Sequence, residues 1–160
     1  MACIVTYGQL QPVEVGVSYV IRTEPHILET MDEWCTRTHS QTGLYAACLD
    51  EACSHPHLDV RTAILAYVLD RVPTPRKACL AGSSVHADKM FLVNEMPELM
   101  AHLHYRIVDV STIKELVRRW YGVSYQRPDT GILHRYVSRC LSQSTRRYPR
   151  IHSRYDIHTH

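Results

Sequence analysis

Two short strand-forming runs, each followed by a segment with helical spacing, dominate the middle of this chain. The runs are Ala78 to Ala81 and Arg106 to Val110, and their composition favours buried strands. Ser111 or Thr112 is expected to cap the second helix, with Glu115 in its first turn. Two strand-helix units in succession predict an α/β fold, in which a sheet is layered with helices.

The N-terminal region predicts strands first and helices afterwards. Ala2 to Thr6 and Val15 to Arg22 are rich in Val, Ile and Tyr, which predicts two strands. Gly8 and Pro12 lie between them, as is typical of an antiparallel pair. The apolar spacing then becomes helical. One predicted helical face comprises Ile27, Leu28, Met31, Trp34 and Cys35, and another comprises Leu58, Ile64, Leu65, Val68 and Leu69.

Composition limits the classes of protein to which the chain can belong. With 160 residues, of which 45% are hydrophobic and 21% charged, it has the size and balance of one soluble globular domain. Its formal net charge of +2 is too small to bind nucleic acid through bulk charge. No apolar run approaches the roughly 20 residues that span a bilayer, and no targeting signal is visible. No membrane contact is therefore expected.

The six cysteines are scattered through apolar segments without a close CxxC pair, which is typical of free thiols in a reducing compartment. Cys48, Cys53, His55 and His57 form a looser group that a small zinc module would use. Structural zinc sites have tighter and paired spacings. The alternative interpretation is a helix end followed by a polar turn at Ser54 to Pro56.

Two islands of sequence carry a resemblance to a known family. The first is LAGSSVHADKMFLVNEMPELMAHLHYRIVDVSTIKELVRRWY, from Leu80 to Tyr121, and the second is MDEWCTRTHSQTGL, from Met31 to Leu44. Both resemble the oligoribonucleases, small dimeric 3′-to-5′ exoribonucleases of the DEDDh group that degrade short RNA with two divalent metal ions. The resemblance implies an RNase H-like exonuclease fold, a mixed sheet flanked by helices, over residues 1–121.

The segment 122–160 has few aliphatic residues and is dense in Arg, Ser, His and Tyr, which predicts an irregular tail. One interpretation is a solvated basic tail or an RNA-binding arm. In the family, however, the third catalytic motif lies about here and reads AASHRALDDIRESI. Back-translating Arg139 to His152 one nucleotide out of register gives codons compatible with that motif at fourteen consecutive positions. The preferred hypothesis is therefore a frameshifted tail.

The resemblance also shows which catalytic residues are present. Asp88, in VHADKMF, matches a family metal ligand, and the alternative is an exposed aspartate at a helix start. His134 and Arg135 imitate the His-Arg of the third motif, but Arg139 stands where that motif has an aspartate. Two Mg²⁺ or Mn²⁺ ions need several carboxylates and a histidine base. With one metal ligand retained, the chain as written is expected to be inactive.

A second family motif is expected upstream. In the family, a strand that carries Asp-x-Glu precedes the segment matching MACIV, so Met1 is expected to be an internal position of a longer protein. That strand lies in the middle of the RNase H-like sheet. Without it, neighbouring backbone donors and acceptors lose their partners, at about 1 to 3 kcal/mol for each buried group.

Trp34 and His39, in DEWCTRTH, match family positions that contact the terminal bases of the RNA. Stacking of an aromatic side chain on a base is worth about 1 to 3 kcal/mol. The alternative places Trp34 in the core of a helical segment.

Ser84, Tyr105, Arg106 and Ser111 match the family's cap over the 5′-phosphate, to which the second subunit contributes the tyrosine. Arginine binds phosphate through paired charge-assisted bonds, so a nearly neutral protein can still select very short RNAs. The alternative puts Arg106 in a surface ion pair. Ser83 replaces the asparagine usual in this motif, which bears on the local loop geometry.

Three classes of function follow. The first is a 3′-to-5′ exoribonuclease that degrades short single-stranded RNA, down to dinucleotides, by two-metal hydrolysis, as a homodimer in the cytoplasm or the mitochondrion. The second is a catalytically dead paralogue that keeps the RNA pocket or the dimer interface. The third is a small zinc module.

Overall fold

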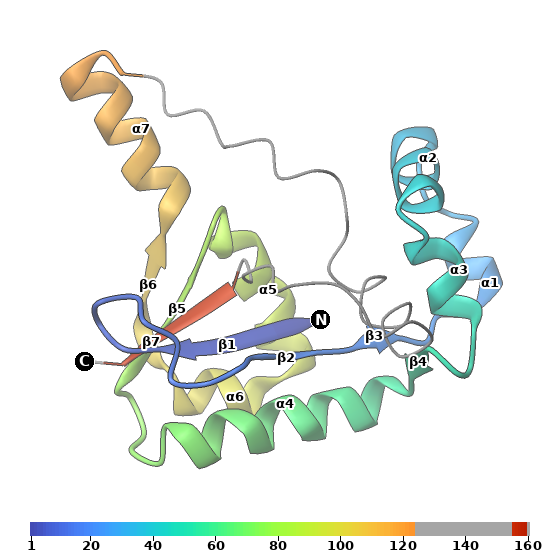
Figure 1. The fold of residues 1–160 in the computed structure, drawn as a ribbon, viewed down its shortest axis with the longest axis horizontal. Helices are drawn as coiled ribbons and strands as arrows, with labels where there is room; N and C mark the ends of the chain where they lie inside the picture. Colours follow the sequence, from blue (N-terminus) through green and yellow to red (C-terminus); the bar gives the residue numbers. More distant parts are fainter. Residues whose placement is uncertain (124–154, 160) are drawn as a thin grey trace. The chain divides into compact units, whose positions relative to one another are not determined.

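The computed structural model describes residues 1–123 and the backbone of residues 155–159 (Figure 1). The described residues fall into two compact units. One unit comprises Met1 and residues 18–62, and the other comprises residues 2–17, 63–123 and 155–159. One boundary falls inside a helix, between Thr62 and Ala63, and another falls inside a short strand, between Val17 and Ser18.

The second unit is built on a five-stranded sheet with the order β2-β1-β7-β5-β6. Its strands are β1 (Ala2–Thr6), β2 (Val17–Ser18), β5 (Ala78–Gly82), β6 (His104–Asp109) and β7 (Tyr155–Thr159). β5 is parallel to β6 and antiparallel to β7, while β7 is parallel to β1. This mixed sheet with its helices is the α/β architecture that the sequence predicted, and it has the form of an RNase H-like exonuclease domain.

Strand β7 occupies the centre of this sheet, between β1 and β5. Its Ile157 is in register with Val5 of β1 and with Leu80 of β5. Every residue of β1 and β5 is buried, so their backbone groups need partners within the sheet. Residues 155–159 are therefore not irregular as predicted, and the central position is not left open. The rest of the predicted tail, 124–154 and residue 160, lies outside the described residues, and its frameshifted origin stays a prediction.

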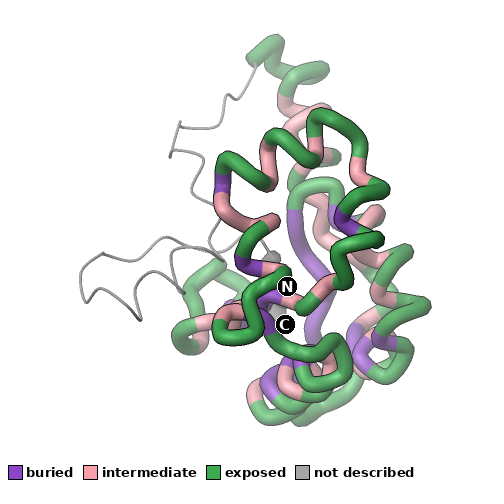
Figure 2. Tube along the Cα trace, turned by 90° about the vertical axis from the view of Figure 1, so that its right-hand side faces the viewer, coloured by how far each residue is buried: buried purple, intermediate pink, exposed green. Residues whose placement is uncertain are grey.

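Four helices complete this part of the chain: α4 (His57–Arg71), α5 (Val85–Glu95), α6 (Pro97–His102) and α7 (Val110–Tyr121). Helix α5 packs against β5 and β6, and α6 packs against β6 and α5. The core includes Val5, Ile64, Val68, Val85 and Leu99, each at most 2% exposed. The buried stretches along the tube in Figure 2 alternate with exposed ones. Among the described helices, none is long and apolar enough to cross a membrane.

The buried face of helix α4 is narrower than its apolar spacing predicted. Ile64 and Val68 are completely buried, but Leu58 is 67% exposed and Leu69 is 42% exposed. Successive residues of an α-helix lie about 100° apart around its axis, so Leu69 is turned away from the stripe that Ile64 and Val68 form. The expectation that Leu58 and Leu69 share the buried face was wrong.

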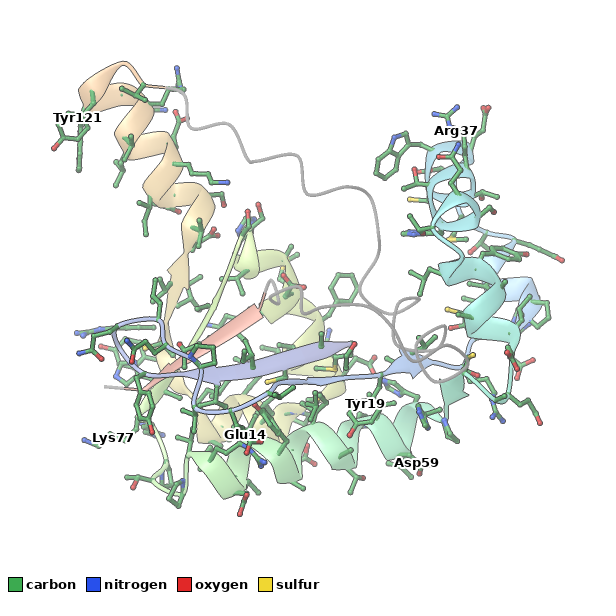
Figure 3. All side chains as sticks on the ribbon, in the orientation of Figure 1. Glu14, Tyr19, Arg37, Asp59, Lys77 and Tyr121 are labelled. Carbon is green, nitrogen blue, oxygen red and sulfur yellow. The ribbon has the colours of Figure 1, made fainter. Side chains whose placement is uncertain are left out.

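Tyr67 ties α4 to the sheet. Its buried hydroxyl accepts a hydrogen bond of 3.3 Å from the backbone N–H of Val5 in β1. Burial raises the pKa of this hydroxyl, so it stays protonated over the physiological pH range. The Arg71 guanidinium lies 4.2 Å from the centre of the Tyr67 ring and pairs with Glu14, which is labelled beside α4 in Figure 3.

The first unit contains small elements. Strand β3 (Val20–Ile21) pairs in parallel with β4 (Ser54–His55), and three helices lie between them in the chain. These are α1 (Pro25–Leu28), α2 (Glu33–Gln41) and α3 (Leu44–Leu49). The predicted strand Val15 to Arg22 is thus divided into β2 and β3, which belong to different sheets. The predicted polar turn at Ser54 to Pro56 contains β4.

The helix predicted from Ile27 to Cys35 is also divided. Asp32 caps α2, because its Oδ1 accepts a hydrogen bond of 2.7 Å from the backbone N–H of Cys35. A cap of this kind starts a new helix. Leu28 is buried, whereas Ile27 and Trp34 are exposed, so the five apolar residues do not form one buried face.

Candidate functional site

The turn that follows β5 lies beside the point where β6 runs directly into α7, in the second unit. Because the two strands are parallel and Gly82 is in register with Asp109, their carboxyl ends meet at the same edge of the sheet. Helix α5 begins at Val85, after a turn of two residues, whereas α7 begins immediately after β6 (Figure 1). This brings together Ser84 and Ser111, two of the predicted site residues, with their hydroxyl oxygens 3.2 Å apart.

Asp109 joins the turn after β5 to the first residues of α7. Its Oδ1 accepts hydrogen bonds of 2.9 Å from the backbone N–H groups of Ser84 and Ser111. The same oxygen accepts a short bond of 2.5 Å from the Ser111 hydroxyl. Its other oxygen, Oδ2, lies 2.9 Å from His86 Nδ1. The side chain of Asp109 is only 9% exposed, so the carboxylate is held among protein groups and not in water.

The electrostatics of Asp109 follow from these contacts. Burial by itself raises the pKa of the carboxyl, but the hydrogen bonds from His86, Ser111 and Ser84 outweigh it. Together they hold the pKa well below its usual range. Asp109 is therefore a fixed negative charge at every physiological pH.

Ser84 has an unusual backbone. Its φ of +58° lies in the left-handed region, which residues other than glycine adopt infrequently. It stands at the N-cap of α5 and makes no side-chain cap bond there. Its N–H is bonded instead to Asp109 and to the Ser111 hydroxyl, the latter at 3.0 Å. Ser83 precedes it in an exposed turn.

Tyr105 and Arg106 lie in an irregular part of β6. On β5, Cys79 and Leu80 are consecutive, but their partners on β6 are His104 and Ile107. Tyr105 and Arg106 are therefore the extra residues of a bulge, a feature that redirects side chains and is common beside active sites. Both are exposed, and the Arg106 guanidinium lies 5.5 Å from the centre of the Tyr105 ring.

The alternative interpretation of Arg106 was a surface ion pair. Within residues 1–123 no carboxylate pairs with this guanidinium, which lies near the Tyr105 ring. The backbone N–H of Arg106 donates a hydrogen bond of 3.1 Å to His104 Nδ1. The neighbouring Lys89 donates to the carbonyl of Tyr105 at 3.1 Å. Two cationic side chains thus lie at the bulge.

Asp88 lies in the first turn of α5, four residues after Ser84, and is partly buried. Over the part of the chain that the structure describes, no three Cys, His, Asp or Glu side chains gather as a metal site requires. The described residues therefore do not fit a two-metal centre around Asp88. The same finding leaves the zinc interpretation of Cys48, Cys53, His55 and His57 without support.

Trp34 and His39 belong to the first unit, on α2. Trp34 is 62% exposed, so it is not the core residue of the alternative interpretation. His39 is partly buried. The structure thus brings Ser84 and Ser111 together and joins Tyr105 to Arg106 in one bulge, whereas the predicted base-contacting pair is described only within its own unit.

Two residues of this site were not found from the sequence, Asp109 and His86. Asp109 is the N-cap of α7, so the prediction of Ser111 or Thr112 at that position was wrong. The available signal was the Asp-Val-Ser order at the end of β6, since aspartate is among the strongest N-cap residues. A depression of about 510 Å³ adjoins Asp109 and is lined by His86, Ile107, Val108, Asp109, Thr112 and Ile113.

Comparison with known proteins gives the family. Residues 1–136 match the family model described as exonuclease. The probable oligoribonuclease of Schizosaccharomyces pombe is 46% identical over 123 residues, which cover 75% of this chain and 47% of that protein. The mitochondrial oligoribonuclease of Mus musculus is 40% identical over 136 residues, covering 84% and 56% of the two chains. The oligoribonuclease of Streptomyces griseus is 45% identical over 126 residues, covering 78% and 61%.

This chain spans about half the length of the first two of these relatives. The matched part includes the turn after β5, the start of α7 and the bulge of β6, since all of them lie within residues 1–136. The chain therefore belongs to the exonuclease family, and within that family to the oligoribonucleases.

Proposed function

We propose that this chain binds short single-stranded RNA for 3′-to-5′ exoribonuclease action. The 5′-phosphate of a dinucleotide binds at the junction of β5 and β6, by which we mean the carboxyl ends of these two strands. The observation that carries the proposal is that the Ser84 and Ser111 hydroxyls lie 3.2 Å apart, while Asp109 accepts from the Ser84 backbone N–H and from the Ser111 hydroxyl. Asp109 lies on the strand that also carries the exposed Arg106. The relatives are named oligoribonucleases, which supports RNA as the substrate class.

The chemistry of the junction suits a phosphate. Hydroxyl groups donate hydrogen bonds to phosphate oxygens, and an arginine fork adds charge-assisted bonds to the same group. The starts of α5 and α7 lie at this edge, and the positive ends of their dipoles favour an anion. Because the overall net charge is only +2, selection of the RNA rests on these placed groups.

Hydrolysis requires more than the described residues supply. In this family two Mg²⁺ or Mn²⁺ ions would activate water and stabilise the leaving 3′-oxygen. Asp88 is the residue proposed to hold such an ion, and one carboxylate does not hold two. No step of the reaction is therefore assigned to this part of the chain, and the proposed role of the described residues is to bind RNA.

We expect the 160-residue chain to bind a dinucleotide without cleaving it. The measurement is incubation of a labelled, 5′-phosphorylated dinucleotide with the protein and Mg²⁺ or Mn²⁺, followed by separation of the products. Binding with no turnover is the expected result. Turnover that Asp88→Ala abolishes would show that the remaining ligands are present after all, and absence of binding would refute the proposed function.

The lack of a metal cluster in the described residues also favours a second candidate, a catalytically dead paralogue that keeps the RNA pocket or the dimer interface. The genomic sequence around the coding region distinguishes the two. An upstream segment that encodes an Asp-x-Glu strand, together with an in-frame SHRALDD, would identify an enzyme. Their absence would identify the paralogue. The relatives include a mitochondrial oligoribonuclease from mouse and a bacterial one from Streptomyces griseus, so the proposed location stays the cytoplasm or the mitochondrion.

Association is proposed from the bulge of β6. Tyr105 is 69% exposed there, which leaves its ring available to a second copy of the chain. We expect a two-fold homodimer whose interface includes Tyr105, since closed two-fold dimers are the commonest assemblies. Light scattering checks this, with Tyr105→Ala expected to shift the population toward monomer. A stable, folded monomer of the unmodified chain at micromolar concentration would contradict it.

A further inference from the structure

Asp109 makes too many contacts with the protein to serve as a ligand itself. A carboxylate offers about four lone-pair positions for hydrogen bonds. In this structure three donors from Ser84 and Ser111 converge on Oδ1, and His86 Nδ1 lies against Oδ2. Both oxygens thus have partners within the protein. A negative charge at this place also repels phosphate, so any benefit it brings to phosphate binding comes through the groups that it holds.

The groups that Asp109 holds are the two hydroxyls of the proposed phosphate site. The Ser84 N–H reaches Asp109 across 25 residues of sequence, which fixes the left-handed backbone of Ser84. Residues in such sparsely populated conformations persist only where their surroundings determine them. Since the backbone of Ser84 sets where its side chain begins, Asp109 also sets the position of the Ser84 hydroxyl.

The direction of the hydroxyl protons follows from the same contacts. Ser111 donates its single hydroxyl proton to Asp109. The Ser111 oxygen accepts a hydrogen bond from the Ser84 N–H. Because the Ser111 proton is directed to Asp109, the hydrogen bond between the two hydroxyls uses the proton of Ser84. The Ser84 O–H is then the hydroxyl whose proton is not committed to the carboxylate. It is the donor that can turn from Ser111 to a phosphate oxygen.

We propose that Asp109 is a positioning residue for phosphate recognition, which holds Ser84 and Ser111 side by side and leaves the Ser84 hydroxyl as the donor to the 5′-phosphate of RNA. This inference rests on the proposed function and adds a residue to it. It assigns to Asp109 a role that differs from capping of α7 alone. A helix cap would support the fold equally for every ligand, whereas a positioning residue acts on the phosphate selectively.

The test uses two labelled dinucleotides that differ only in the 5′-phosphate, and it measures the ratio of their dissociation constants. The unmodified chain is expected to prefer the phosphorylated form. Asp109→Ala is expected to reduce that preference about tenfold, as loss of a well-aligned hydrogen bond to a charged group does. Asp109→Asn keeps an acceptor for the Ser84 and Ser111 amides, so it should retain most of the preference.

Glu115→Ala is the matched control, because Glu115 is a carboxylate of α7, the helix that Asp109 caps, and its partners are Arg118 and Arg119. It should leave the preference unchanged. Hydrogen exchange of the Ser84 amide, measured without nucleotide, should be faster in Asp109→Ala than in Asp109→Asn.

The outcomes separate the two proposals. A folded Asp109→Ala variant that keeps the whole phosphate preference overturns the positioning role alone, as does unchanged exchange at the Ser84 amide. An unmodified chain that binds neither dinucleotide refutes the proposed function, and the amide exchange then still decides whether Asp109 holds Ser84.

Discussion

Replacing Arg106 with alanine is expected to weaken the binding of a 5′-phosphorylated dinucleotide by about ten- to a hundredfold. Removal of a charge-assisted phosphate contact costs roughly 1.5 to 3 kcal/mol. The backbone bond from Arg106 N to His104 Nδ1 does not involve the side chain, so the bulge that presents this position should remain. Fluorescence anisotropy with the labelled dinucleotide measures the effect.

Two comparisons make the Arg106 result specific. Arg119→Ala removes another exposed guanidinium, one that pairs with Glu115 on α7, and it should change the affinity little. A longer RNA that places no 5′-phosphate at the cap should lose much less affinity than the dinucleotide when Arg106 is replaced. An equal loss on both RNAs would mean that Arg106 supports only the fold.

Replacing Ile64 with alanine is expected to lower the free energy of unfolding by about 2 to 5 kcal/mol, because the change leaves a cavity in a packed interior. Ile64 is completely buried and lies one helical turn from Val68, which is buried as well. A loss of this size is a large part of the roughly 5 to 15 kcal/mol that stabilises a typical domain. Urea unfolding followed by circular dichroism measures it.

Leu58→Ala is the control for this prediction, since Leu58 belongs to the same helix but is 67% exposed. A substitution at such a surface position usually changes stability by no more than about 0.5 kcal/mol. Equal losses at Leu58 and Ile64 would restore the original expectation that both share one buried face. They would also mean that α4 packs differently from the arrangement described above.

The sequence alone predicted the fold class and most of its elements. Strand β1 has the predicted bounds, Ala2–Thr6, and β5 extends the predicted Ala78 to Ala81 by one residue. The order of strand and helix in both units was found, because an apolar run followed by helical spacing is a local pattern that neighbouring residues determine. The second strand, however, is His104–Asp109 and has no buried residue, so the expectation of a buried strand from Arg106 to Val110 was wrong. The family was equally accessible, since its motifs are continuous stretches of sequence and Ser84, Arg106 and Ser111 lie inside them.

The sequence did not predict the structural features that depend on partners distant in the chain. The strand predicted from Val15 to Arg22 is divided because its two halves pair with different strands, and apolar content does not encode the partner. The buried face of α4 was overestimated for the same reason, as Leu58 and Leu69 are apolar but meet no packed surface. β7 came to the centre of the sheet because two buried strands needed backbone partners there.

The same distinction between local sequence and tertiary structure applies to the candidate site. The sequence by itself determined which residue types are present: two serines, an arginine and a tyrosine in the order that the family motif has. Only the tertiary structure decided that Asp109 joins the turn after β5 to the start of α7, since its contact with Ser84 spans 25 residues. It likewise decided that Tyr105 and Arg106 lie in a bulge, because a register shift is a property of two paired strands and not of either strand alone.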